Sequence, residues 1–282
     1  GALCVVLPGD PAPLIVRKSD GGFGYAATDL AAIRHRVESL RADRLVYVVG
    51  APQAHHFQQV FETARLAGWL PAAVSAEHVG FGSVLGPDGK MFKTRDGKAV
   101  TLDALLDAAE QAAAPEVAMA AVKYADLSNS LQKDYVFDVD RMVATTGNTG
   151  PYLQYAHARV CQILRRADAE GEDYGPAAVR ALLDSPGGLP AGVLDAPAEQ
   201  TLALLLTRYG DTTAEVAATL HPHHLCGCLF DVAAALSVFY ERCPVLKAEG
   251  PVRTARLLLC QATRTVLAAG LGLLGIQAPE RM

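Results

Sequence analysis

The pattern of hydrophobic and polar positions changes near residue 102. Before that point, short apolar runs alternate with segments in which apolar residues recur every three or four positions. The runs predict strands at 2–7, 14–16, 45–49 and 78–85, and the spaced segments predict helices at 29–40 and 54–67. This alternation favours a buried, mostly parallel sheet covered by helices, and we expect 2–7 to be an interior strand.

From residue 102 onward the spacing of apolar residues is helical throughout. It predicts helices at 102–113, 117–127, 152–167, 202–209, 225–240 and 253–274. Loops rich in Pro, Gly and Asp separate them, for example at 184–188. The sequence therefore predicts an α/β portion followed by an all-α bundle.

The composition is that of a folded protein. Of the 282 residues, 51% are hydrophobic and 20% charged, which excludes disorder as the main state. The net charge of −5 provides no overall basic field, so a nucleic-acid partner would need a local basic face. Six scattered cysteines favour a reducing cytoplasm over a disulfide framework. The longest apolar stretch, 266–276, is shorter than a bilayer span, so no membrane partner is expected.

A glycine-rich stretch at 82–97 leads into three cations and a hydroxyl: Lys90, Lys93, Arg95 and Thr94. A flexible backbone followed by cations suits the oxygens of a polyphosphate. The glycine spacing is not that of a Walker A loop. From residue types alone, a solvated basic hairpin is the favoured interpretation.

A second candidate group combines a phenol, a carboxylate and an amide. Tyr25 and Asp29 lie one helical turn apart, and Gln53 follows the apolar run at 45–49. Ligands of open α/β sheets lie beyond the carboxyl ends of the strands. Gln53 and its neighbours His55 and His56 are therefore well placed to contact a ligand. Together these groups could hold a cationic head group such as a guanidinium. The simpler alternative is that Asp29 complements a helix dipole.

The segment 221–228 contains three histidines and two cysteines. Cys226 and Cys228 are two positions apart and would face different sides of a helix, which does not suit zinc. A helix start with two small buried thiols is favoured, and no metal site is predicted.

Six short motifs occur in order along the chain. They are KSDGGFGYAATD at 18–29, QAHHF at 53–57, HVGFG at 78–82, KMFKTR at 90–95, KYADLS at 123–128 and GNTGPYLQYA at 147–156. Together they resemble the arginyl-tRNA synthetases, a family of class I aminoacyl-tRNA synthetases. The resemblance implies an α/β partial Rossmann-type catalytic domain at 1–120, a stem-contact junction at 121–150 and an all-α anticodon-binding helical domain of the DALR type at 151–282.

The resemblance also implies roles for the candidate residues. The arginine pocket would contain Tyr25, Asp29, Gln53 and His56. By this resemblance Asp29 would bind the arginine side chain and would not serve only to complement a helix dipole. A KMSKS-type loop would supply the catalytic residues Lys90, Lys93 and Thr94, with Lys93 on the departing pyrophosphate. His78, Phe81, Gly82 and Lys93 would contact ATP, and Tyr240 and Met282 would approach the anticodon.

The implied activity is that of an arginine-tRNA ligase. The arginine carboxylate would attack the ATP α-phosphate, and the resulting arginyl adenylate would be transferred to the terminal ribose of tRNA(Arg). The resemblance thus implies ATP with Mg²⁺ as cofactor, and L-arginine and tRNA(Arg) as partners. A monomeric, cytoplasmic protein is expected.

Several departures from the family pattern qualify this expectation. None of the eight histidines supplies a HIGH signature, the segment 110–121 is short, and Leu131 and Val139 stand where arginine and tryptophan are common in the family. Because the chain also begins at Gly1 rather than Met, we expect the C-terminal part of a longer ligase, inactive in isolation. The alternative is a truncated, non-catalytic paralogue that binds tRNA or arginine.

Overall fold

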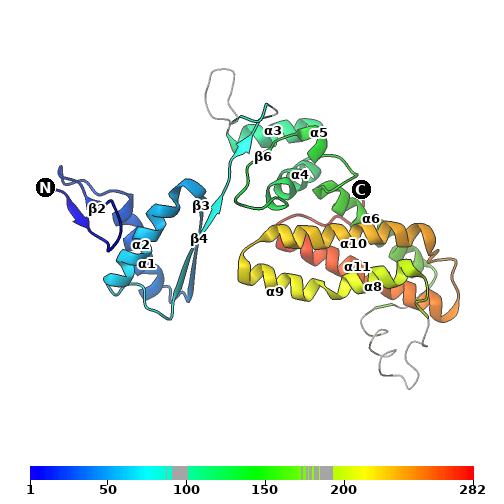
Figure 1. Ribbon diagram of the computed structural model, residues 1–282. Coiled ribbons are helices and arrows are strands. Elements are labelled where there is room, and N and C mark those ends of the chain that lie inside the picture. Colours follow the sequence, from blue (N-terminus) through cyan, green and yellow to red (C-terminus); the bar gives the residue numbers. More distant parts are fainter. Residues whose placement is uncertain are drawn as a thin grey trace. The chain divides into compact units, whose positions relative to one another are not determined.

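The chain forms two compact units (Figure 1). Unit 1 comprises Gly1–Val84 and Leu131–Tyr135, and unit 2 comprises Leu85–Ser130 and Val136–Met282. The structure, a computed structural model, describes residues 1–86, 88–90, 101–172, 174–175, 177, 180, 184 and 193–282.

Unit 1 contains the α/β portion. Its elements, in order, are β1 (Leu3–Val5), β2 (Leu14–Arg17), α1 (Tyr25–Glu38), β3 (Arg44–Gly50), the short 3₁₀ helix η1 (Ala51–Gln53), α2 (Ala54–Leu66) and β4 (Ser75–Phe81). β3 and β4 are parallel, and β1 and β2 are antiparallel. The core lies between β3 and the two helices and includes Ile33, Leu45, Phe57 and Val60. The helices expected at 29–40 and 54–67 are confirmed.

Two expectations about the strands of unit 1 are wrong. β1 is not an interior strand: it pairs with β2 alone, and Leu3 is 62% exposed. β3 is not buried on both faces, since Leu45 and Tyr47 face the core while Val48 is 62% exposed. Alternate side chains of a strand point to opposite faces, and an apolar run does not show that both faces are covered. The expected parallel pairing is present in β3 and β4, one of three two-stranded sheets in the described residues.

The third strand pair joins β5 (Val84–Leu85) to β6 (Tyr135–Val136). Just before β5, the amide of Gly82 donates a hydrogen bond of 2.7 Å to the carbonyl of Leu131. A Cβ atom at Gly82 would lie 2.7 Å from the carbonyl carbon of Lys133. The two backbone segments therefore approach closely because residue 82 has no side chain.

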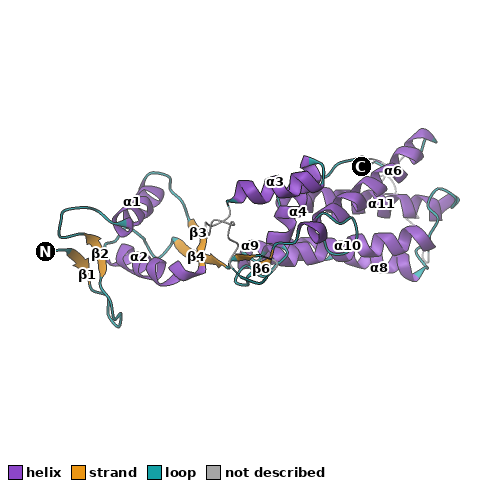
Figure 2. Cartoon of the chain, turned by 90° about the horizontal axis from the view of Figure 1, so that it is seen from above, coloured by secondary structure: helices purple, strands orange, loops and turns teal. Residues whose placement is uncertain are grey.

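Unit 2 is helical, and Figure 2 shows its helices in purple. Its helices are α3 (Leu102–Ala112), α4 (Pro115–Leu127), α5 (Val139–Met142), α6 (Gly150–Ala169), α8 (Pro197–Thr207), α9 (Tyr209–Thr219), α10 (Pro222–Arg242) and α11 (Gly250–Leu273). The six helices expected from the spacing are confirmed. α9 was not expected, because its inward face is only half apolar: Tyr209 and Val216 are partly buried against the core, and Thr212 and Thr213 lie between them.

The core of unit 2 is formed chiefly by α6, α10 and α11, with Leu153, Leu229, Leu236 and Leu267 fully buried. By length and composition alone, α10 could cross a membrane, but the core helices of soluble proteins meet the same criterion. α10 packs against α6, α8, α9 and α11. The absence of a membrane partner stays a prediction.

Candidate functional site

The four residues expected to form the arginine pocket come from the N-terminal parts of α1 and α2 and from η1. Nε2 of His56 is 2.7 Å from Oδ2 of Asp29, and both side chains are about one quarter exposed. Tyr25 is the first residue of α1 and Gln53 is the last of η1, directly before α2. Of these four residues, only Asp29 and His56 are bonded to each other, and Tyr25 is 86% exposed. The helix-packing interface in unit 1 thus presents a carboxylate already paired with an imidazole.

His78, on β4, is turned toward α2. Its ring stacks on Phe57 with centroids 5.2 Å apart and planes at 13°, and its Nε2 donates to the carbonyl of Val49 at 3.0 Å. Phe81, the last residue of β4, is 42% exposed. β4 therefore carries an oriented imidazole at its middle and an accessible ring at its carboxyl end, where the closely packed Gly82 follows.

Lys90 follows a tight turn. The carbonyl of Lys90 accepts a hydrogen bond of 2.8 Å from the amide of Gly86, and its own amide donates to Oδ1 of Asp88 at 3.1 Å. Gly89 has a φ of +72°, in the left-handed region that favours glycine. The Lys90 side chain is exposed. Lys93 and Thr94 lie outside the described residues.

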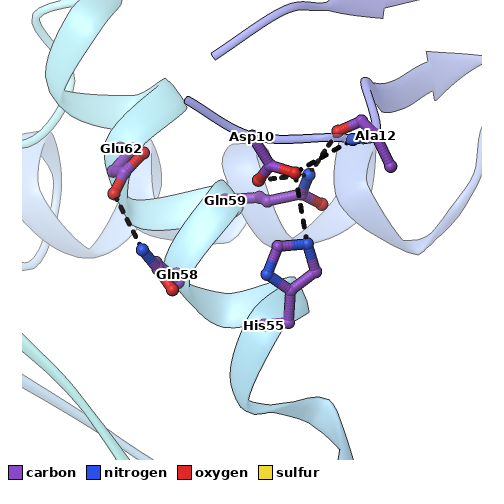
Figure 3. A network of polar contacts seen from close by, with 6 residues as sticks. All are labelled: Asp10, Ala12, His55, Gln58, Gln59 and Glu62. Atoms are coloured by element: carbon purple, nitrogen blue, oxygen red, sulfur yellow. Dashed lines mark hydrogen bonds and ion pairs between the residues drawn. The ribbon is translucent and has the colours of Figure 1, made fainter. Parts of the chain in front are cut away.

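A polar network that the sequence did not indicate lies beside the residues of the expected arginine pocket (Figure 3). Nε2 of Gln59 donates to Oδ2 of Asp10 at 2.9 Å and to the carbonyl of Ala12 at 2.7 Å, and Nε2 of His55 lies 3.4 Å from Oδ1 of Asp10. The amide of Ala12 also donates to Asp10, and this bond is the main reason why the pKa of Asp10 is lowered. The network fastens the loop between β1 and β2 to α2, next to His56. The spacing of Asp10 and Ala12, typical of an Asx turn, was the available signal.

In unit 2, an arginine lies between two tyrosine rings. Cζ of Arg159 is 4.7 Å from the ring centroid of Tyr155 and 4.9 Å from that of Tyr240. The guanidinium also donates to the hydroxyl of Tyr155 at 2.7 Å. Tyr155 and Arg159 are one turn apart on α6, whereas Tyr240 lies near the end of α10. Helical spacing could therefore have indicated the contact between Tyr155 and Arg159, but not the contact of Arg159 with Tyr240.

Two surface hollows adjoin this cluster. One, of about 280 Å³, is lined by Tyr155, Ala158, Arg159, Gln162, Arg165, Arg281 and Met282. The other, of about 370 Å³, is lined by Tyr240 and further residues that include Gln162, Arg166 and Lys247. Met282 and Tyr240 thus lie beside neighbouring hollows. The charged residues that line the two hollows are five cations, Arg159, Arg165, Arg166, Lys247 and Arg281, and one carboxylate, Glu241. A nucleic-acid partner of this acidic chain requires such a local excess of cations.

The C-terminal tail, which we define as residues 275–282, lies along α6 (Figures 1 and 2). Side-chain donors bind its carbonyls: Gln154 that of Gln277 at 2.9 Å, His157 that of Pro279 at 2.9 Å, and Arg165 that of Glu280 at 2.8 Å. At its start, Nζ of Lys123 donates to the carbonyl of Gly275 at 2.5 Å. The last residues of the chain thus have a defined course.

We expect His157 to make the stability of the chain depend on pH. Burial, reinforced by Arg264, lowers its pKa, although the bond to Pro279 and the charge of Glu280 act in the opposite direction. The folded state therefore favours the neutral imidazole, and the unfolded state takes up the proton first as pH falls below about 6.5. This stabilisation is complete above that pH and is lost as pH falls toward the folded pKa, by at most about 1.4 kcal/mol per pH unit.

Urea unfolding of the chain and of His157→Asn between pH 7.5 and 5.5 checks this expectation. Asparagine retains a donor but does not titrate, so the variant should lose less stability over the interval than the unaltered chain. Equal losses would show that His157 does not carry this dependence.

The histidine-rich segment 221–228 forms a helix start, as expected. The rings of His223 and His224 are 4.3 Å apart, and Nδ1 of His224 lies 2.7 Å from Oε1 of Glu215. Cys226 is buried, which raises its pKa to about 12, whereas Cys228 is half-buried and corrects the expectation of two buried thiols. The described residues contain no group of three or more His, Cys, Asp or Glu that could hold a metal ion.

Comparisons with known protein families match both portions of the chain. Residues 1–116 match the family described as tRNA synthetases class I (R), catalytic domain, and residues 153–282 match the DALR anticodon binding domain. These matches fit the α/β portion and the helical bundle.

Individual relatives extend this similarity to the whole chain. Arginine–tRNA ligase of Cutibacterium acnes is 62% identical to this chain, in a match that covers 100% of this chain and 50% of the ligase. Arginine–tRNA ligase of Thermobifida fusca is 49% identical, in a match that covers 100% of this chain and 51% of the ligase. The arginyl-tRNA synthetase structure from Thermus thermophilus matches with a TM-score of 0.82 and 28% identity over 100% of this chain and 54% of its own. The chain spans about half the length of the curated relatives it matches. With a partial class I catalytic domain followed by a DALR helical domain, the chain belongs to the arginyl-tRNA synthetase family.

Proposed function

We propose that this chain acts in the ATP-dependent attachment of arginine to tRNA(Arg), with unit 2 supplying contacts to the tRNA. The observation that carries the proposal is the basic and aromatic surface around Arg159, Tyr240 and Met282. RNA loops are recognised through bases that stack on aromatic or guanidinium planes, while cations bind the backbone phosphates. Both kinds of group line the two hollows.

The arginine substrate would bind to unit 1 near Asp29. A carboxylate pairs bidentately with a guanidinium, and Tyr25 and Gln53 lie at the same helix ends with side chains exposed to solvent. In the free chain His56 holds Asp29, so arginine would replace or rearrange this contact. The proposed pocket thus consists of Tyr25, Asp29, Gln53 and His56.

ATP would bind at the carboxyl end of β4. Ligands of parallel α/β sheets lie at this edge, and His78, three residues before it on β4, is already oriented by Phe57 and Val49. We propose that His78, Phe81 and Gly82 flank the adenosine and that Lys90, with Lys93 and Thr94, contacts the phosphates. Mg²⁺ commonly binds through substrate phosphates, and we propose that it arrives with ATP.

The proposed chemistry needs positioning and charge stabilisation rather than a covalent enzyme intermediate. Asp29 would orient arginine so that its carboxylate attacks the α-phosphate, and the lysines would stabilise the departing pyrophosphate. We retain 1–120, 121–150 and 151–282 as the proposed domains, which the two family matches support at 1–116 and 153–282. The six free cysteines support a cytoplasmic location, and a monomeric state stays a prediction.

Binding of tRNA to the purified chain tests the proposal. We expect the chain to bind a tRNA(Arg) transcript in a filter-binding assay more tightly than the same transcript with a substituted anticodon. Equal affinity for both transcripts, or no binding, would overturn the role given to unit 2. Arginine-dependent ATP–pyrophosphate exchange by the same preparation would rule out the non-catalytic alternative.

A further inference from the structure

We propose that Gln154 and His157 are positioning residues for tRNA recognition: they fix the course of the C-terminal tail so that Arg281 and Met282 line the hollow beside Arg159. The inference rests on the proposed tRNA-binding role of unit 2. Neither Gln154 nor His157 lines that hollow, so any effect they have on tRNA must pass through the tail or through the fold.

The donor side chains on α6 and the tail carbonyls that they bind follow the same order along the helix. Positions 154, 157 and 165 share one face of α6, because they differ by three and eight residues. They bind the carbonyls of Gln277, Pro279 and Glu280 in the same order. The tail therefore runs along α6 toward its C-terminal end, held by side chains about one and then about two turns apart.

These bonds take the place of regular secondary structure. α11 ends at Leu273, so the carbonyls of the tail have no helical partner. Gln154 is fully buried and His157 is 3% exposed, so water does not readily replace them. Loss of a buried donor leaves its acceptor unsatisfied, which costs more than the bond itself contributed. Ile276 is also buried and anchors the tail by its apolar side chain.

The tail ends where the proposed tRNA contacts are. Arg281 and Met282 line the hollow together with Tyr155, Arg159 and Arg165. Arg165 both binds Glu280 and lines the hollow, so its replacement would mix two effects. Replacement of Gln154 or His157 separates the two effects, because these residues bind the tail but do not line the hollow.

The test uses Gln154→Met and His157→Leu, which remove one donor each at nearly constant volume. The rescue variant is His157→Asn, which keeps a donor close to the position of Nδ1. The matched control is Thr263→Val: Thr263 is fully buried, and its hydroxyl donates to the carbonyl of Leu259 within α11. Two quantities are measured on the purified chain, namely amide hydrogen exchange of the tail and the affinity for a tRNA(Arg) transcript.

We expect Gln154→Met and His157→Leu to speed exchange in the tail by about tenfold and weaken tRNA binding by about fivefold to twentyfold, while exchange in α10 is unchanged. His157→Asn should restore most of the slow exchange in the tail and most of the tRNA affinity, and Thr263→Val should change neither quantity. Unchanged exchange in the tail would overturn the inference, as would a loosened tail with unchanged tRNA affinity or an equal loss of affinity in Thr263→Val. If the unaltered chain does not bind tRNA, the proposed function fails, and unchanged tail exchange would then still overturn the role of the two donors.

Discussion

Replacing Gly150 by alanine should destabilise unit 2 by about 3 kcal/mol, at the upper end of the range for overpacking. Gly150 is the first residue of α6 and packs directly on α4. A Cβ atom at this position would lie 2.3 Å from the carbonyl oxygen of Ala120, 2.7 Å from its carbonyl carbon and 3.0 Å from Cβ of Tyr124. The clash is with the backbone of a helix, which cannot turn away as a side-chain end can.

The surroundings of Gly150 allow little relief. Tyr124 is fully buried, and its hydroxyl lies 2.6 Å from Oδ1 of Asn148 and 3.0 Å from the carbonyl of Cys226. Thr149 caps α6 by accepting a hydrogen bond from the amide of Tyr152 at 3.2 Å. Moving α6 away from α4 would therefore strain both the cap and the bonds of Tyr124.

Urea unfolding of Gly150→Ala measures this loss, and Gly227→Ala is its matched control. Gly227 is an exposed residue within α10, and a Cβ atom there would meet no heavy atom within 4 Å. Because alanine favours the helix over glycine, the control should gain up to about 1 kcal/mol. Similar midpoints for Gly150→Ala and the unaltered chain would contradict the close packing of α4 and α6.

The sequence predicts the helices of this chain well and the burial of its strands poorly, for one physical reason. A helix that packs on a core carries an apolar stripe, as α6, α10 and α11 do. α9 was missed because only Tyr209 and Val216 of its inward face are apolar, and both are only partly buried. An apolar run such as 45–49 identifies β3 but cannot show what covers each face. Val48 is exposed although it belongs to the same run as the buried Tyr47.

The candidate sites also differ in how far the sequence could predict them. Tyr25 and Asp29 could be grouped from the sequence because they share a helix, and His56 could be added because it follows the apolar run at 45–49; the motif resemblance then assigned all three to the arginine pocket. The contacts of Arg159 with Tyr240 and of His157 with Pro279 join residues about 80 and 122 positions apart in the chain. No local pattern indicates such pairs, since they depend on how α6, α10 and the tail pack.

The arginine between the two tyrosines leads to the largest expected effect on function. We expect Arg159→Ala to weaken binding of a tRNA(Arg) transcript by about tenfold to a hundredfold, the range of one lost stacking platform together with one lost phosphate contact. The substitution removes a cation whose plane lies within 5 Å of both ring centroids. Tyr155 and Tyr240 would then lose the group that orients their rings at the edge of the hollows.

Arg159→Lys distinguishes the contribution of the positive charge from that of the planar guanidinium group. Lysine keeps the charge but cannot stack on a ring or donate two parallel hydrogen bonds. This variant should bind more weakly than the unaltered chain yet keep the same dependence of affinity on salt, whereas Arg159→Ala should reduce the salt slope by about one. Arg34→Ala is the control: Arg34 is an exposed arginine of α1 paired with Glu38, and its loss lowers the net charge equally. Equal weakening by Arg34→Ala would mean that tRNA responds to overall charge alone. A selective effect of Arg159 would instead show that binding depends on its position between α6 and α10.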